Sequence, residues 1–278
     1  MCKFEKMTGF FKISMKSLLI IFPVISLLVT GCEKIIDVDL NDANPTIVIE
    51  GNLSMNDSSV NVLLSETGSY FGDGQLRKVS GAIVNLEDNE GNLFQVDEKE
   101  EGLYINDQVN ARPGGHYKLS VSYKGTEYSA VSFLNPPVRI DSAGYERSER
   151  TRFYEEGYRI NIFFEDPPGK ENYYRINVYK NGELMSASND LIVFDDSGID
   201  GKIVQVKLRG QRFNTHDRAY LEMCAIDKPV WRYFSTLRDV ANLNPGSPAP
   251  ANPISNFNNG ALGYFSAWSY DTKFIIIK

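Results

Sequence analysis

Short segments of alternating apolar and polar residues recur along most of this chain, and turn residues separate them. Alternation places successive side chains on opposite faces of a strand, whereas a helix repeats its apolar positions every three to four residues. The segments are rich in Val, Ile, Tyr and Phe, which favour strands. The sequence therefore predicts a mainly β protein built from two Ig-like or fibronectin-like β-sandwich domains.

The expected strands form two groups. The first group comprises 46–53, 59–64, 82–87, 93–96, 102–106, 116–123 and 126–133. The second group comprises 159–164, 172–179, 191–194, 202–208, 219–226 and a closing strand at 274–277, with a further apolar piece at 261–267. Adjacent prolines in segment 135–142 end a strand and stiffen a connector. We therefore place the two sandwich domains at 45–137 and 138–278.

One helix interrupts the β pattern near the C-terminus. Asp227 can cap its first turn, and proline is favoured where Pro229 would lie. The apolar residues at helical spacing are Val230, Phe234, Leu237 and Ala241. Because Asn244-Pro-Gly246 then ends the pattern, we expect a helix over about residues 228–242.

The N-terminal segment has the features of a bacterial lipoprotein signal. Lys16 precedes an apolar run that contains Pro23 and ends in Val29-Thr-Gly-Cys32. A basic start, a short apolar run and a small residue before the cut define a secretory signal, and a spanning helix needs about 20 apolar residues. We predict a signal peptide at 1–31, acyl chains such as palmitate on Cys32, and a tether at 32–44. Met15 is a second candidate start, and a simple secretory signal or a short membrane anchor are the alternatives.

The net charge and the cysteine content limit the partners and the covalent links that the chain can form. The chain carries a net charge of -7, and loss of residues 1–31 removes four lysines and one glutamate, which gives -10. An acidic protein repels phosphate backbones, so we expect no nucleic acid partner. Besides Cys2 and Cys32, the chain has one cysteine, Cys224. A single thiol cannot form an internal disulfide, and we expect Cys224 to be a buried structural residue.

Several segments carry a family resemblance. The most specific is Asn252-Pro-Ile-Ser-Asn-Phe-Asn-Asn-Gly-Ala-Leu-Gly-Tyr-Phe-Ser-Ala267, and the others are 32–40, 47–51, 113–121, 140–142 and 172–176. With these segments the chain resembles the Bacteroidetes outer-membrane lipoproteins grouped as domain-of-unknown-function family 4249 (DUF4249). The resemblance implies a lipid-anchored protein on the periplasmic or cell-surface face of the outer membrane, commonly encoded beside a TonB-dependent receptor. It implies no known catalytic residues.

The sequence contains few arrangements that indicate catalysis. It has no Gly-x-Ser-x-Gly, His-Glu-x-x-His or P-loop motif, and its two histidines, His116 and His216, fall at turns or strand edges. Segment 196–201 resembles the start of a calcium loop. Because Gly198 and Lys207 occupy positions where ligands belong, an acidic turn is favoured. We expect no cofactor and no metal.

The residues most suited to bind a ligand or partner are aromatic and amide side chains near the C-terminus. These candidates are Trp231, Tyr233, Asn256, Asn259 and Tyr264. Each has a structural alternative, because aromatic side chains pack in cores and a segment rich in Pro and Asn can simply cross a sandwich face.

Together these features predict a non-enzymatic outer-membrane lipoprotein. We expect it to assist a TonB-dependent receptor in capturing a nutrient, either a small molecule or a peptide. A structural or adhesive cell-surface module is the first alternative and a surface hydrolase the second, because fold alone does not determine function.

Overall fold

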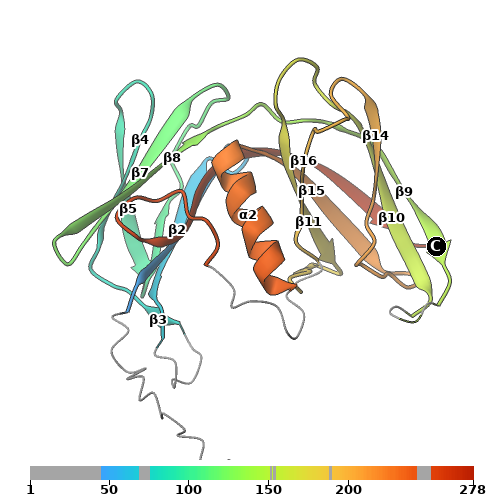
Figure 1. Cartoon of the computed structure of the whole chain (residues 1–278), viewed down its shortest axis with the longest axis horizontal. Coiled ribbons are helices and arrows are strands. Elements are labelled where there is room, and N and C mark those ends of the chain that lie inside the picture. The colour runs from blue at the N-terminus through green and yellow to red at the C-terminus, as the bar shows by residue number, and fades with distance from the viewer. Residues whose placement is uncertain (1–44, 69–75, 151, 153–154, 188–189, 243–251) are drawn as a thin grey trace, which may run out of the picture. The chain divides into compact units, whose positions relative to one another are not determined.

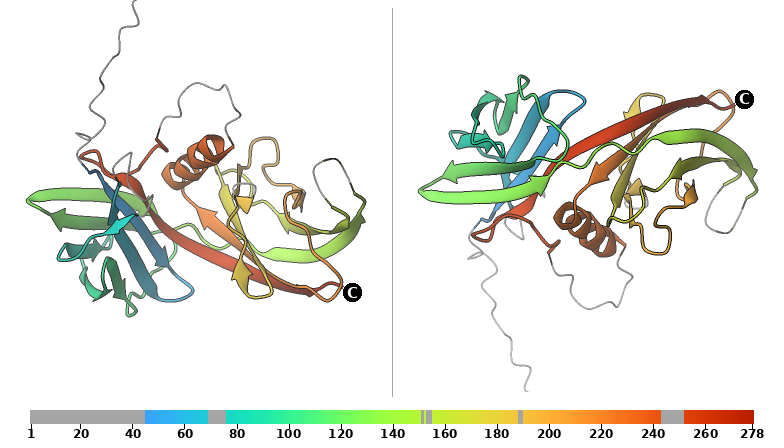
Figure 2. Two further views of the ribbon diagram at one scale, coloured as in Figure 1. Left: turned by 90° about the horizontal axis from the view of Figure 1, so that it is seen from below. Right: turned by 90° about the horizontal axis from the view of Figure 1, so that it is seen from above.

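A long strand near the C-terminus, β16 (Leu262–Ile276), joins the two halves of the fold. Its first half pairs in parallel with β1 (Ile47–Ser54), and its second half pairs antiparallel with β15 (Arg218–Ile226). Figure 2 shows this strand, in dark red, running from one half to the other. The computed structural model describes residues 45–68, 76–150, 152, 155–187, 190–242 and 252–278. The predicted signal peptide, the tether and Cys32 lie outside these ranges.

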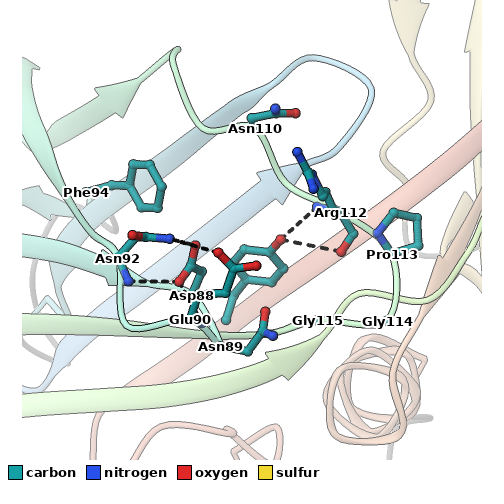
Figure 3. A pocket seen from close by; sticks show the side chains of 11 residues that line it. Asp88, Asn89, Glu90, Asn92, Phe94, Asn110, Arg112, Pro113, Gly114 and Gly115 are labelled. Atoms are coloured by element: carbon teal, nitrogen blue, oxygen red, sulfur yellow. Dashed lines mark hydrogen bonds between the residues drawn. The ribbon is translucent and has the colours of Figure 1, made fainter.

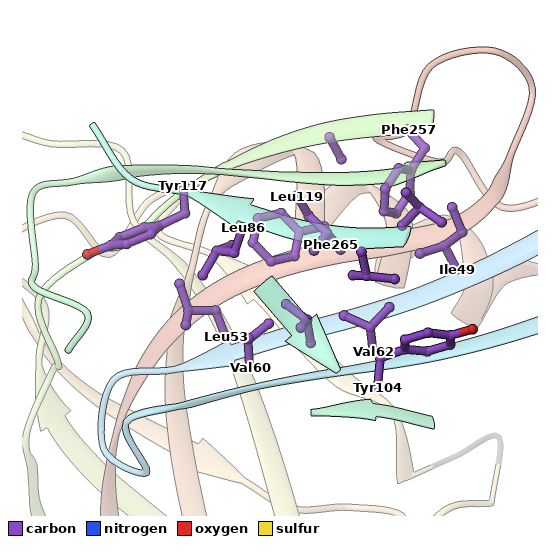
Figure 4. Packing of buried hydrophobic residues seen from close by; sticks show 14 of the residues in the cluster. Ile49, Leu53, Val60, Val62, Leu86, Tyr104, Tyr117, Leu119, Phe257 and Phe265 are labelled. Atoms are coloured by element: carbon purple, nitrogen blue, oxygen red, sulfur yellow. The ribbon is translucent and has the colours of Figure 1, made fainter. Parts of the chain in front are cut away.

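The first half of the fold is a curled sheet in the order β16-β1-β2-β6-β5-β4-β7-β8, in which β3 pairs with β2. The strands not yet located are β2 (Ser59–Glu66), β3 (Arg77–Lys78), β4 (Ile83–Glu87), β5 (Leu93–Glu100), β6 (Leu103–Asn106), β7 (His116–Tyr123) and β8 (Thr126–Phe133). Alternate residues of these strands meet in one buried cluster. Figure 4 shows Ile49, Val62, Leu119 and Phe265 facing one another there.

The second half packs two sheets face to face. One sheet has the order β14-β10-β9, and the other continues from β16 through β15 and β11 to β12, with β13 paired to β11. The strands are β9 (Ile140–Ser148), β10 (Gly157–Glu165), β11 (Tyr173–Lys180), β12 (Glu183–Leu184), β13 (Ile192–Asp195) and β14 (Ile203–Lys207). Ile160, Ile162 and Phe164 from one sheet meet Leu221 and Met223 from the other in a second buried cluster.

Helix α2 (Lys228–Ala241) lies against the opposite face of this second sheet (Figure 1). Its start agrees with the prediction, because the Asp227 side chain accepts a hydrogen bond from the Val230 N–H at 3.0 Å and Pro229 lies in the first turn. Val230, Tyr233 and Phe234 are the buried residues of the helix. Within the described ranges, no helix has the length and apolarity needed to cross a membrane.

The structure confirms a mainly β fold that is consistent with a β-sandwich, and it corrects three local predictions. Segments 261–267 and 274–277 are parts of one strand, β16. Strand β9 begins at Ile140, inside the segment expected to be a connector. Phe257 and Phe265, which the sequence assigned to the second domain, pack in the cluster of the first half. The physical reason for this last difference is the parallel pairing of β1 with β16, a long-range contact that no local pattern encodes.

Candidate functional site

Two of the candidate aromatic residues meet where helix α2 packs on the sheet: Tyr233 on the buried face of the helix and Tyr264 on β16. Tyr233 is 7% exposed and Tyr264 is 8% exposed, and their ring centroids are 4.9 Å apart. The Tyr264 hydroxyl donates a hydrogen bond to Asn52 Oδ1 at 3.1 Å. Burial raises the pKa of both phenols above the usual value. These side chains pack the helix onto the sheet and offer little surface to a ligand.

Arg175 on β11 lies in the same region, and sequence reasoning did not single it out. Its guanidinium carbon is 4.1 Å from the Phe234 ring centroid and 5.6 Å from that of Trp268. Its buried Nη1 has no hydrogen-bond partner among the described residues. Burial raises the pKa of the Glu50 carboxyl, and the charge of Arg175 acts in the opposite direction. Aromatic faces therefore stabilise this cation.

The structure brings two candidate residues, Trp231 and Asn256, together at one cleft of about 380 Å³. Trp231 is half-buried and its ring lies 5.3 Å from that of Tyr173. The other lining residues are Lys228, Pro229, Arg232, Ile254 and Ser255, and Ile254 is 42% exposed. The cleft thus combines an indole, an exposed aliphatic side chain and a guanidinium, groups that can hold an apolar ligand with an anionic substituent.

The asparagines of the 252–259 segment bond to strand backbones. The Asn256 amide accepts from Phe265 N–H and donates to Phe265 C=O, at 2.9 and 2.8 Å. Asn258 also bonds to a strand backbone, at the edge of β8, where its Oδ1 accepts a hydrogen bond from Ser129 N–H at 2.7 Å. Asn259 Nδ2 donates to the Glu127 carbonyl at 2.8 Å. Asn256 and Asn259 therefore fix the 252–259 segment to the strands that it crosses. This is the structural alternative that the sequence analysis gave for these two residues.

A polar cleft of about 390 Å³ lies between the 88–92 turn and the loop that precedes β7 (Figure 3). Its side chains are engaged in holding these loops. Asp88 accepts hydrogen bonds from the backbone of Glu90 and Asn92, both at 2.9 Å. The Tyr117 hydroxyl accepts from Arg112 N–H at 2.7 Å, an arrangement that resembles the tyrosine corner of Ig-type sandwiches. The polar groups of Asp88 and Tyr117 that line this cleft therefore stabilise the two loops.

A larger cleft of about 680 Å³ is lined by five prolines together with Phe133, Tyr173 and Tyr174. The prolines are Pro113, Pro136, Pro137, Pro167 and Pro168. Pockets of 300–1,000 Å³ that are mainly apolar are typical of small-molecule sites. Its walls offer few charged groups, with Lys170 as the one ionised side chain among the lining residues.

Three carboxylates converge beside this cleft. Oxygen atoms of Asp166, Asp196 and Asp200 lie within 4.8 Å of one another. Asp166 is fully buried and accepts hydrogen bonds from the Tyr174 hydroxyl and from Gly201 N–H. Burial, and then the bond to Asp166, raises the pKa of Tyr174. The sequence indicated only the 196–201 turn, because Asp166 belongs to a turn some 30 residues earlier.

The other two carboxylates accept hydrogen bonds from backbone N–H groups. Asp196 accepts from Asn172 N–H and Asp200 from Gly169 N–H, both at 2.8 Å. The cluster therefore ties two turns together.

Cys224 and the two histidines lie outside these clefts. Cys224 is fully buried, as expected, and burial raises the pKa of its thiol to about 12. The exposed His116 ring lies 4.8 Å from that of Phe133. His216 adopts a positive φ of 73° in a turn, and its backbone N–H bonds to Ile277.

Comparison with known proteins assigns the chain to a family. The model of a family described as "Domain of unknown function (DUF4249)" matches residues 33–274. The chain belongs to the DUF4249 family. A search of curated proteins gave no match.

Every cleft described above lies inside the part of the chain that matches DUF4249. The match also begins directly after Cys32.

Proposed function

We propose that this DUF4249 protein is a non-enzymatic, lipid-anchored protein of the outer membrane that assists a TonB-dependent receptor in nutrient uptake. The observation that carries the proposal is the Val29-Thr-Gly-Cys32 sequence at the end of a short apolar run. Acyl chains on Cys32 would hold the protein at the membrane surface and leave residues 45–278 in water. Its family resemblance supports the receptor as partner.

The described clefts support binding rather than catalysis. The Trp231 cleft and the proline-lined cleft have aromatic and aliphatic walls with a few polar side chains, including Arg232 and Lys228 in the first and Lys170 in the second. Neither His116 nor His216 lines either of them. We assign nutrient capture to the Trp231 cleft, because it combines a half-buried indole with Arg232 and the exposed side chain of Ile254.

The test is recovery of partners from native outer membranes. The full-length tagged protein is extracted in mild detergent and bound proteins are identified by mass spectrometry, with Cys32→Ala as the control. The proposal predicts stoichiometric recovery of one TonB-dependent receptor, and loss of that receptor from the control. Recovery of the protein alone, or with matrix polymers, would contradict it and favour a structural or adhesive module.

A further inference from the structure

The end of β16 beyond Tyr270 forms an open sheet edge. Residues 269–276 pair with β15 on one side. On the other side, Asn56 bonds both backbone groups of Tyr270, each at 3.0 Å. In an antiparallel strand the N–H and C=O of alternate residues point to the same edge. The backbone groups of Thr272, Phe274 and Ile276 therefore point away from β15, to the side where Asn56 lies.

The neighbouring residue Ile277 supports this direction. Its N–H donates to the Asp217 carbonyl at 3.0 Å and its carbonyl accepts from His216 N–H at 2.7 Å, both at the start of β15. Odd-numbered residues thus face β15 and even-numbered residues face outward. In the part of the chain that the structure describes, β16 pairs with β1 and β15 alone, so no strand forms ladder hydrogen bonds with the outward backbone groups of Thr272, Phe274 and Ile276. Beyond Ile276 this side is occupied, because the Tyr145 hydroxyl of β9 accepts from Lys278 N–H at 3.0 Å.

This edge is apolar and exposed. Phe274 is 56% exposed and Ile276 is 46% exposed. Proteins normally cover or charge such edges, because an open edge pairs with other chains. The edge of β8 shows that protection, since Asn258 bonds Ser129 and the Asp227 carboxylate accepts from Phe133 N–H at 2.8 Å.

We propose that a second copy of this chain covers the edge, with the two β16 strands paired antiparallel about a two-fold axis at Phe274. In this register Phe274 lies opposite Phe274, Thr272 opposite Ile276, and Lys273 opposite Ile275. Outward-facing residues meet outward-facing residues, which is the condition for hydrogen-bonded pairs. Exposed apolar groups meet their own copies and no like charges oppose each other. An isologous interface requires this self-complementarity.

The position of the edge favours a protein over the bilayer as its partner. The chain enters the described body at β1, whose Val48 lies opposite Leu262 at the start of β16. Phe274 follows Leu262 by as much as about 40 Å along an extended strand. The described residues therefore begin near the end of β16 that is opposite to Phe274.

The proposal goes beyond the receptor partnership and is tested without any receptor. Two differently tagged full-length copies, one with Thr272→Cys and the other with Ile276→Cys, are co-expressed and oxidised in native membranes. Cα atoms of hydrogen-bonded pairs lie about 5.5 Å apart, within the range of about 4.4–6.8 Å that a disulfide spans. We expect a crosslinked dimer that carries both tags. Neither variant alone should crosslink, because position 272 never lies opposite its own copy.

Matched controls isolate the edge. Ile203→Cys, at a residue that is 78% exposed on β14, should give no dimer above the parent chain, whose Cys224 is fully buried. Phe274→Lys in both copies should abolish the crosslink, whereas Ile203→Lys should leave it. Absence of the mixed dimer, or its survival in Phe274→Lys, would overturn the proposal. Loss of receptor recovery in Phe274→Lys without any mixed dimer would assign the edge to the receptor and equally overturn it.

Discussion

Asp227 connects the helix and both halves of the fold through one carboxylate. It accepts hydrogen bonds from Val230 N–H at 3.0 Å, Phe133 N–H at 2.8 Å and the Ser132 hydroxyl at 2.9 Å. The sequence predicted its role as the helix cap, because that role depends on the next few residues. It did not predict the bonds to β8, because these join residues more than 90 positions apart.

Replacing Asp227 should therefore cost more than loss of a helix cap. Asp227→Ala leaves two backbone donors and one hydroxyl without their acceptor, and we expect the free energy of unfolding to fall by about 2–4 kcal/mol. Chemical denaturation measures the change. Asp239→Ala is the matched control on the same helix, because that side chain is 73% exposed, and it should change stability little. Equal losses in the two variants would refute the connecting role.

Glu66 at the end of β2 gives a prediction about pH. Hydrogen bonds from Lys124 and Arg77 lower the pKa of this carboxyl below its usual value. The unfolded chain therefore binds a proton at higher pH than the folded protein, and the stabilisation is complete at neutral pH and is lost as pH falls through the lowered pKa. We expect Glu66→Gln to be less stable than the parent at pH 7, with the difference shrinking in strongly acidic solution. A difference that is independent of pH would contradict this account.

At the scale of elements, local and long-range signals behave differently. Helix α2 and hairpins such as β7–β8 agree with prediction, because capping, periodicity and turn residues are local. The continuity of β16 was missed, because its polar centre around Asp271 and Lys273 resembles a break between two strands. The Trp231 cleft was only half predicted, since the sequence identified both Trp231 and Asn256 but gave no reason to bring them together.

The parallel contact of β16 with β1 depends on Gly263. Its φ is +94°, and a Cβ placed there would lie 2.0 Å from the Ile49 carbonyl oxygen. We expect Gly263→Ala to lower the free energy of unfolding by more than about 3 kcal/mol, because the backbone of β1 must move away from the new Cβ and the alanine must adopt a strained positive φ. Gly260→Ala is the control, with φ at +76° and no atom within 4 Å, and should cost only about 1 kcal/mol. Similar losses in both variants, measured by denaturation, would argue against the close approach.

At the scale of the whole molecule, β16 makes the two halves interdependent. The first half lacks a strand and the aromatic residue Phe265 of its core until residues 262–268 arrive from the C-terminus. Because this pairing spans more than 200 residues, composition and local pattern predicted the class of fold but not this connection. Helix α2, which carries Trp231, packs on the same continuous sheet that has its open edge at Phe274.

The account of function depends on a lipid anchor at Cys32, since the membrane location and the receptor partnership both follow from it. The most direct measurement is the mass of the N-terminal peptide of the protein isolated from native outer membranes. We predict that the mature chain begins at Cys32 and that this residue carries acyl chains. A mature protein that retains residues before Cys32, or that begins there with an unmodified thiol, would contradict the central claim.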